Sequence, residues 1–322
     1  MTFKIRLKPS DHQFELEGKE TILRAGMRSG LNLPHNCMNG SCGNCLAKLV
    51  DGEIEQVRHH DHKLTPEQIQ KREFLTCCHK PATNLVLEMH EQDTVQEIPY
   101  QEIMAKVSKT DLCEDDVMHL QLRASRSQVL VFLAGQKVEL YLKDGSCVRL
   151  GISSCPCDGL SLRFHLRNTG GEFCSKIFPQ LKKGEKILIK GPMGDFTLNE
   201  SSEAPLIFIA WDTGFAQIQS IIDHVISESE ERQIRVLWLS DRTHYFENYC
   251  RAWADVLDNF HYETVNCSLS ETSSILLERM EKIDCLEQHD IYAVLPEKQL
   301  SGLKQLLGEK EFPTNQLYTD VF

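Results

Sequence analysis

Long apolar runs are missing from this chain of 322 residues, and none approaches the roughly 18 residues of a membrane-spanning helix. Residues 1–8 alternate between polar and apolar side chains, as a strand does, and they lack the continuous apolar segment of a signal peptide. We therefore expect a cytoplasmic protein without a membrane span. In that compartment cysteines remain reduced, so we expect the 13 cysteines to be thiols rather than disulfides.

Basic residues are scarce relative to acidic ones. The chain has 35 Lys and Arg against 47 Asp and Glu, which gives a formal net charge of −12. Because a nucleic-acid partner calls for a basic surface that neutralises phosphates, this balance argues against nucleic-acid binding. The acidic excess is compatible with steering toward a basic face of a redox partner, and equally with simple solubility.

The cysteines include one dense motif. Cys37, Cys42 and Cys45 follow the spacing C-x4-C-x2-C, and Cys77 follows after a gap. This is the plant-type ligand spacing of a [2Fe–2S] cluster, in which four thiolates hold two bridged iron ions. A zinc site would more often show two C-x2-C pairs or a C-x2-C pair with histidines. A disulfide framework would need an oxidising compartment, for which the sequence carries no signal.

Two features around the motif bear on the cluster. Gly40 and Gly43 allow the backbone to wrap around the inorganic sulfides and to point N–H groups inward. The histidine-rich segment 58–62 is interpreted as a solvated loop rather than a metal site, because no cysteine or carboxylate is suitably spaced from it. His35 is not counted as a ligand.

Residues 1–95 have the element order of a β-grasp fold, and this segment resembles a plant-type ferredoxin. The resemblance places the fourth ligand at Cys77, which follows Leu75 and Thr76, rather than at the adjacent Cys78. The expected elements are strands at 2–8, 13–17 and 84–89, a strand pair at 46–54 about an Asp51-Gly52 turn, a helix at 21–30, and a helix starting at Pro66 with Thr65 as its N-cap.

Two further segments differ from the first, and from each other, in their pattern of apolar residues. After a polar linker, residues 99–200 contain many short alternating strands and one helix, which predicts a small antiparallel barrel. From residue 203 the pattern changes to continuous apolar strands, beginning at 206–210, that alternate with helices. This alternation predicts a doubly wound parallel sheet over residues 203–322.

Taken together, the three segments resemble the ferredoxin–NAD(P)+ reductase-like electron-transfer proteins, in the domain order of oxygenase reductase components. The CDP-6-deoxyglucoseen reductases are similar, because the first segment ends with Leu-Thr-Cys-Cys and then Asn-Leu-Val-Leu-Glu. The resemblance implies a ferredoxin domain at 1–95, an FAD-binding-type barrel at 99–200 and an NAD(P)-binding-type α/β domain at 203–322.

The resemblance also implies where FAD binds. The family's Arg-x-Tyr-Ser signature falls on residues 148–151, where the aromatic ring and the hydroxyl are missing, and its Gly-Gly-x-x-Ser loop falls on 170–174. N–H groups at the start of the following helix would hold the flavin pyrophosphate, and the terminal aromatic residue would cover the ring. The implied residues are Arg149, Leu150, Gly151, Ile152, Ser153, Gly170, Gly171, Cys174, Ser175 and Phe322.

The nucleotide motif is altered as well. The family has Gly-Gly-Thr-Gly-x-Ala-Pro after the first parallel strand, and residues 211–217 read Trp-Asp-Thr-Gly-Phe-Ala-Gln. Thr213 and Gly214 are retained and are the implied NAD(P)H-binding residues. Trp211 and Asp212 replace glycines that allow a dinucleotide to approach closely, and a carboxylate repels a pyrophosphate unless it is turned away.

We expect an NAD(P)H-dependent oxidoreductase that passes electrons through FAD and a [2Fe–2S] cluster to a partner oxygenase, dehydratase or similar redox enzyme. Such a protein needs no acid–base dyad or nucleophile, and the sequence shows no catalytic side chain. The alternative is a non-enzymatic [2Fe–2S] carrier or accessory subunit whose reductase domains have lost flavin or nucleotide binding.

Overall fold

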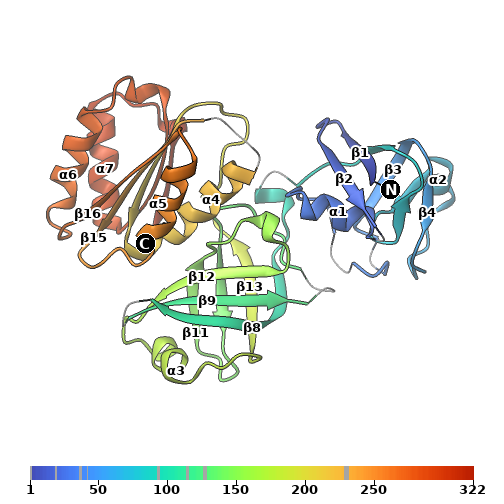
Figure 1. The fold of residues 1–322 in the computed structure, drawn as a ribbon, viewed down its shortest axis with the longest axis horizontal. Coiled ribbons are helices and arrows are strands. Elements are labelled where there is room, and N and C mark those ends of the chain that lie inside the picture. Colours follow the sequence, from blue (N-terminus) through green and yellow to red (C-terminus); the bar gives the residue numbers. More distant parts are fainter. Residues whose placement is uncertain are drawn as a thin grey trace.

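The computed structural model describes residues 2–18, 20–35, 38–41, 43–92, 95–113, 116–125, 129–227 and 232–322. The predicted ligands Cys37 and Cys42 lie outside these ranges. Figure 1 shows three parts that follow one another along the chain, each built around its own sheet and coloured blue, green and orange to red. This three-part architecture is the fold class expected from the sequence.

The first part is a β-grasp sheet covered by one helix. Its five strands lie in the order β2-β1-β7-β3-β5, and β1 and β7 are parallel. Alternation along β1 directs Ile5 and Leu7 into the core, where they meet Leu23 of α1. The elements are β1 (Thr2–Lys8), β2 (Gln13–Glu17), α1 (Ile22–Arg28), β3 (Leu46–Asp51), β4 (Ile54–Gln56), α2 (Pro66–Gln70), β5 (Glu73–Leu75), β6 (His79–Pro81) and β7 (Leu85–Glu88).

The predicted strand pair at 46–54 is wrong. The chain turns at Gly52, where φ is 94°, but β4 does not pair back onto β3. Both edges of β3 are already occupied, by β5 on one side and β7 on the other, so β4 forms a separate two-stranded sheet with β6. By contrast, Thr65 caps α2 as predicted: its side chain accepts a hydrogen bond from the Gln68 N–H, and its own N–H donates to the Gln68 side chain.

The second part is a six-stranded antiparallel sheet that curls into a nearly closed barrel. The strand order is β11-β10-β13-β8-β9-β12, and the Ser153 N–H after β11 donates to the Arg163 carbonyl of β12, which brings the two edges together. The elements are β8 (Gln101–Cys113), β9 (Val117–Ala124), β10 (Lys137–Tyr141), β11 (Cys147–Gly151), the short 3-10 helix η2 (Pro156–Asp158), β12 (Ser161–Arg167), α3 (Glu172–Gln180) and β13 (Lys186–Met193).

The third part is a doubly wound parallel sheet in the order β16-β15-β14-β17-β18. All six residues of β14 are buried, because helices α4 and α5 cover one face and α6 and α7 the other. Its elements are β14 (Leu206–Trp211), the 3-10 turn η3 (Asp212–Gly214), α4 (Phe215–Ser227), β15 (Ile234–Ser240), α5 (Glu247–Val256), β16 (Phe260–Asn266), α6 (Thr272–Glu281), β17 (Asp290–Leu295), α7 (Glu297–Glu309) and β18 (Leu317–Val321).

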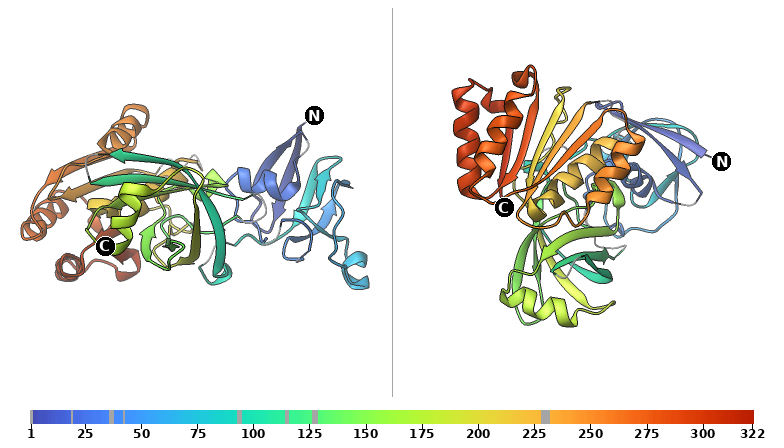
Figure 2. Two further views of the ribbon diagram at one scale, coloured as in Figure 1. Left: turned by 90° about the horizontal axis from the view of Figure 1, so that it is seen from below. Right: turned by 60° about the vertical axis from the view of Figure 1, so that its left-hand side comes forward.

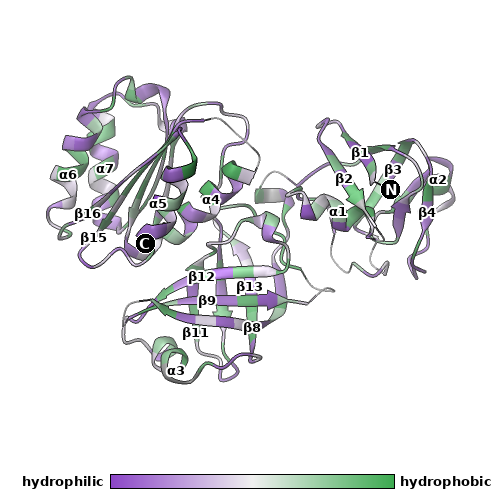
Figure 3. Ribbon diagram, in the orientation of Figure 1, coloured by the Kyte–Doolittle hydropathy of each residue, from purple (hydrophilic) through white to green (hydrophobic). Residues whose placement is uncertain are grey.

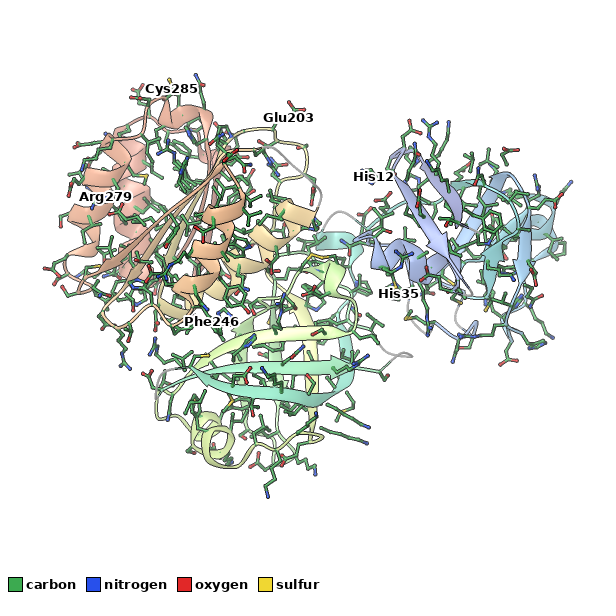
Figure 4. The ribbon with its side chains drawn as sticks, in the orientation of Figure 1. His12, His35, Glu203, Phe246, Arg279 and Cys285 are labelled. Atoms are coloured by element: carbon green, nitrogen blue, oxygen red, sulfur yellow. A yellow bond between two sulfur atoms is a disulfide. The ribbon has the colours of Figure 1, made fainter. Side chains whose placement is uncertain are left out.

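The barrel lies between the other two parts in the left-hand view of Figure 2. Figure 4 shows Phe246 at the boundary between the α/β part and the barrel. Its ring packs edge-on against the rings of His119 and His165, with ring centroids 5.2 and 5.1 Å apart. Figure 3 shows hydrophilic and hydrophobic bands on α6 and α7, as expected for helices with one buried face. Among the described residues, the helices are too short or too polar to cross a membrane.

Candidate functional site

Two predicted cluster ligands come from different elements and meet in the fold. Cys45 lies just before β3 and Cys77 just after β5, and these strands pair with Leu46 opposite Leu75. Both the N–H and the hydroxyl of Thr76 donate to the Cys45 carbonyl at 3.0 Å, and these bonds hold the segment of Cys77 beside that of Cys45. A hydrogen bond with Cys77, together with burial, raises the pKa of the Cys45 thiol. A bound cation would therefore be needed to hold both side chains as thiolates.

The loop that carries the other ligands depends on its glycines. Gly40 and Gly43 have φ of 88° and 84°. A Cβ at Gly40 would lie 2.6 Å from the Cys78 Sγ, and one at Gly43 would lie 2.4 Å from the His62 ring. The loop backbone is therefore in contact with side chains from the rest of the first part, which leaves no room for a larger residue.

The histidine-rich segment is only partly the solvated loop predicted from the sequence. His59 is 89% exposed at its side chain, but His60 and His62 are half-buried against the two loop glycines. Arg58 donates to the Met38 carbonyl at 2.6 Å, and the His62 N–H donates to the Gly40 carbonyl at 3.0 Å. These contacts hold the segment over the cysteine loop, and a run of polar residues gave no local sign of them.

The neighbours of the ligands are buried too. Cys77 and Cys78 lie with their sulfurs 3.5 Å apart, and both side chains are shielded from solvent, so the choice of Cys77 stays a prediction. His35 is 5% exposed, and its Nδ1 lies 2.7 Å from the Leu33 carbonyl. Burial lowers the pKa of His35, which favours the neutral imidazole.

The predicted flavin segment does not lie open. Arg149 forms an exposed ion pair with Glu139 at 2.9 Å on the neighbouring strand, and Leu150 is half-buried. Gly151 stands where the family has the hydroxyl near the flavin. A Cβ at Gly151 would lie 2.3 Å from the Gln217 Cγ, so the Gln217 side chain occupies the space over this backbone.

The Gln217 side chain is held in place from both parts. Its Nε2 donates to the Gly135 carbonyl of the barrel at 2.6 Å and to the Asp320 carboxylate of β18 at 2.8 Å. Lys137 pairs with the same carboxylate at 2.8 Å. Phe322 is 47% exposed, and its N–H donates to the Leu295 carbonyl. The ring end of an FAD site does not fit this arrangement as it stands.

The residues after Gly151 are buried. Ile152 and Ser153 have no exposed surface, and the Ser153 hydroxyl has no hydrogen-bond partner among the described residues. Such an orphaned hydroxyl costs free energy unless water or a ligand reaches it.

The predicted pyrophosphate loop, in contrast, is open. Gly170 has a φ of 75°, and a Cβ added there would have no atom within 4 Å. Gly171 is the N-cap of α3, and no side chain caps this end of the helix. Cys174 is buried, and its thiol donates to the Arg167 carbonyl, which gives it a packing role. Ser175 donates to the Glu172 carbonyl. The free N–H groups at the start of α3 fit a phosphate.

The predicted dinucleotide turn holds an ion pair. Asp212 lies just before α4 with a φ of 48° and is 5% exposed. Its two carboxylate oxygens accept bonds from Arg167 of the barrel at 2.7 and 2.6 Å. Gly214 is close to β17, because a Cβ there would lie 2.8 Å from the Val294 Cγ1, and Thr213 is half-buried. The turn that the resemblance assigns to the dinucleotide is therefore occupied by an ion pair between the barrel and the α/β part.

The ion pair is part of a larger cluster of charges. Arg167 also bonds Asp116 at 2.6 Å, and Asp116 in turn bonds Arg242. Although burial alone raises the pKa of Asp116, its hydrogen bonds to Arg167 and Arg242 hold it below the usual value. No local pattern indicated this cluster, because its four members come from four separate segments of the chain.

Comparisons with known proteins agree with this architecture. The family model of the 2Fe-2S iron–sulfur cluster binding domain matches residues 5–82. Protein RfbI of Salmonella typhimurium is 30% identical over an alignment that covers 100% of this chain and 97% of the relative. The CDP-6-deoxy-L-threo-D-glycero-4-hexulose-3-dehydrase reductase of Yersinia pestis is 26% identical, with 100% and 99% covered.

A solved structure shows the same fold. The cytochrome P450 reductase GcoB of Amycolatopsis superposes with a TM-score of 0.61 at 19% identity, over 99% of this chain and 98% of that chain. The alignment with RfbI covers all of this chain and 97% of RfbI. The chain therefore belongs to the family of ferredoxin–NAD(P)+ reductase-like electron-transfer proteins with an N-terminal [2Fe–2S] domain that includes RfbI.

Proposed function

We propose that this protein is an electron-transfer component of the reductase type, which passes single electrons through a [2Fe–2S] cluster to a partner redox enzyme. The observation that carries the proposal is the approach of Cys45 and Cys77 beside a loop whose glycines admit no side chain. Cys37, Cys42, Cys45 and Cys77 would hold the cluster. When bound, the cluster would accept and donate single electrons, and the side chains of its ligands Cys45 and Cys77 are buried.

The partner is proposed from the relatives. Their names identify a dehydrase reductase and, in Comamonas, a reductase component of terephthalate 1,2-dioxygenase, which is 29% identical over 74% of this chain. We therefore propose an oxygenase, a dehydratase or a similar redox enzyme as the electron acceptor. The net charge of −12 is compatible with a basic docking face on that partner.

FAD is the second proposed carrier, and its site is supported at one end only. The open start of α3, with Gly170 and Gly171, suits the pyrophosphate. The ring end is filled by Gln217, and the nucleotide turn is filled by the Arg167–Asp212 pair. For this reason we derive no electron path through a flavin or a nicotinamide.

These two filled positions favour a second candidate function. In that case the protein is a [2Fe–2S] carrier or accessory subunit, and the barrel and α/β part serve as a scaffold for docking. The two candidates share the cluster and the partner, and they differ only in the source of electrons.

An absorption spectrum of the purified protein, followed by anaerobic addition of NADH and then NADPH, separates the candidates. Cluster and flavin bands that bleach with either nucleotide would support the reductase. Cluster bands that neither nucleotide bleaches, even after addition of FAD, would support the carrier. A protein without cluster bands after reconstitution with iron and sulfide would overturn both.

We also propose the domain limits 1–95, 99–200 and 203–322. We further propose a cytoplasmic location, because a cluster held by four thiolates requires reduced cysteines. Limited proteolysis at residues 96–98 and 201–202, and fractionation of cells, test these two statements.

A further inference from the structure

Two cysteines outside the cluster motif are joined. Cys155 and Cys157 form a disulfide in the loop between β11 and β12, which includes η2. It is the yellow bond in Figure 4. The expectation that every cysteine is a thiol is wrong for this pair, because Pro156 turns the chain tightly enough to bring the two sulfurs together.

The disulfide lies where the three parts meet. The helix η2 contacts both α1 of the first part and α4 of the third. Leu160, three residues after Cys157, packs against the core that contains Cys45 and Cys77. Gly159 and Leu160 also line one pocket together with Met38 of the cysteine loop. The loop that carries the disulfide is therefore packed against the loop that carries the predicted cluster ligands.

Polar groups lie close to the buried sulfur of the pair. Cys155 is 2% exposed, whereas Cys157 is half-buried. The Cys157 N–H donates to the Cys155 Sγ at 3.2 Å, and the His224 Nδ1 and the Ser227 hydroxyl lie 4.0 and 3.9 Å away. An N–H donor of this kind stabilises a thiolate. Since the Ser227 hydroxyl donates to the His224 carbonyl, the His224 imidazole is the group placed to exchange a proton with the sulfur. The surroundings therefore suit a sulfur that changes its redox state, more than one that only packs.

We propose that Cys155 and Cys157 are a redox-active pair that exchanges electrons with the [2Fe–2S] cluster. This proposal rests on the proposed function, because the cluster is the electron donor. An external one-electron reductant, dithionite in the test below, reduces the cluster twice in succession, and the cluster passes both electrons to the disulfide. With two protons taken up, the S–S bond breaks and two thiols form. Oxidation of the thiols returns both electrons and both protons. The pair gives the chain a two-electron store, directly after the segment in which the family's flavin signature is lost.

The test is a reductive titration of the full chain with its cluster assembled. Dithionite is added in steps under anaerobic conditions, and thiols are alkylated and located by mass spectrometry after each step. We expect wild-type protein to take up one electron for the cluster and two more for the disulfide, with Cys155 and Cys157 becoming alkylated. The variant Cys155→Ser/Cys157→Ser should take up one electron only, with an unchanged cluster spectrum.

The controls separate passage through the cluster from direct chemical reduction. Cys285→Ser removes an exposed thiol of the α/β part, labelled in Figure 4, and should leave the electron count unchanged. In Cys45→Ser, or in wild-type protein stripped of its cluster by a chelator, the two thiols should appear at least tenfold more slowly. Equal rates with and without the cluster would overturn the proposal, as would alkylation of both cysteines before any reductant is added. A wild-type spectrum without cluster bands would instead contradict the proposed function.

Discussion

Gly40 is the residue on which the cysteine loop depends most directly. Gly40→Ala would place a methyl group 2.6 Å from the Cys78 sulfur at a φ of 88°, a conformation that costs an L-residue roughly 1–2 kcal/mol before any clash. We expect less iron and acid-labile sulfide per chain and weaker visible absorption. Gly145→Ala is the matched control, because its φ of 87° imposes the same strain but no atom lies within 4 Å. Equal cluster content in the two variants would contradict this account.

The adjacent cysteines can be told apart by the same measurement. Cys77→Ser should abolish the cluster bands, because Cys77 interacts with Cys45 and is the predicted fourth ligand. Cys78→Ser should keep them, because Cys78 is not one of the four predicted ligands. The reverse result would assign the ligand role to Cys78.

Asp223 makes stability depend on pH. Burial raises the pKa of Asp223 to about 7, although Arg163 lies 3.3 Å away and lowers it. The pKa of an aspartate carboxyl in an unfolded chain is about 3.9. Between about pH 3.9 and about pH 7, the folded chain therefore holds a proton on Asp223 that the unfolded chain has lost. The free energy of unfolding therefore falls as pH rises through this window, by at most about 1.4 kcal/mol per unit.

Asp223→Asn removes this titration. Relative to wild type, the variant should gain stability as pH rises from about 4 to about 7, as measured by urea unfolding at several pH values. If the two proteins keep parallel stability curves across this range, the proton on Asp223 is not what sets the slope.

The turn before α4 is held by a charge pair that spans two sheets. Arg167 and Asp212 are 8% and 7% exposed at their side chains, so Arg167→Met leaves a buried, unpaired carboxylate. We expect a loss of about 3–5 kcal/mol in the free energy of unfolding. Arg167→Met/Asp212→Asn should recover most of it, because asparagine tolerates the φ of 48° and carries no charge. A double-mutant cycle by chemical denaturation measures the coupling, and additive losses would contradict the pairing.

Local sequence patterns were sufficient to predict most of the strands and helices. Continuous apolar runs marked the buried parallel strands, and β14 (Leu206–Trp211) covers the strand expected at 206–210. The pairing of β4 was missed because it depends on which edges of β3 are taken by strands far along the chain. The Arg167–Asp212 pair joins residues 45 positions apart, and Gln217 and Asp320 are 103 positions apart. No local pattern encodes such contacts, so the filled flavin and nucleotide positions became visible only in the fold.

Those long-range contacts decide how the barrel and the α/β part are joined. Gln217, on α4, bonds the barrel at Gly135 and the last strand at Asp320, and Lys137 ties the same carboxylate back to β10. A flavin ring over Gly151 would have to displace the Gln217 side chain and break both of its hydrogen bonds, each worth about 1 kcal/mol net. The chain thus closes with its own Gln217 side chain the position that the resemblance assigns to the flavin ring.

Gln217→Ala should therefore strengthen FAD binding. Removing the side chain opens the space over Gly151 and leaves Asp320 paired with Lys137, so the two parts stay joined. We expect the dissociation constant for FAD, measured by equilibrium dialysis, to fall about tenfold, which corresponds to ~1.4 kcal/mol. Gln299→Ala is the matched control, because it removes another buried glutamine, on α7, that bonds a backbone carbonyl. If both variants bind FAD as wild type does, Gln217 does not close the ring site, and the lost aromatic and hydroxyl side chains of residues 150 and 151 must set the affinity instead.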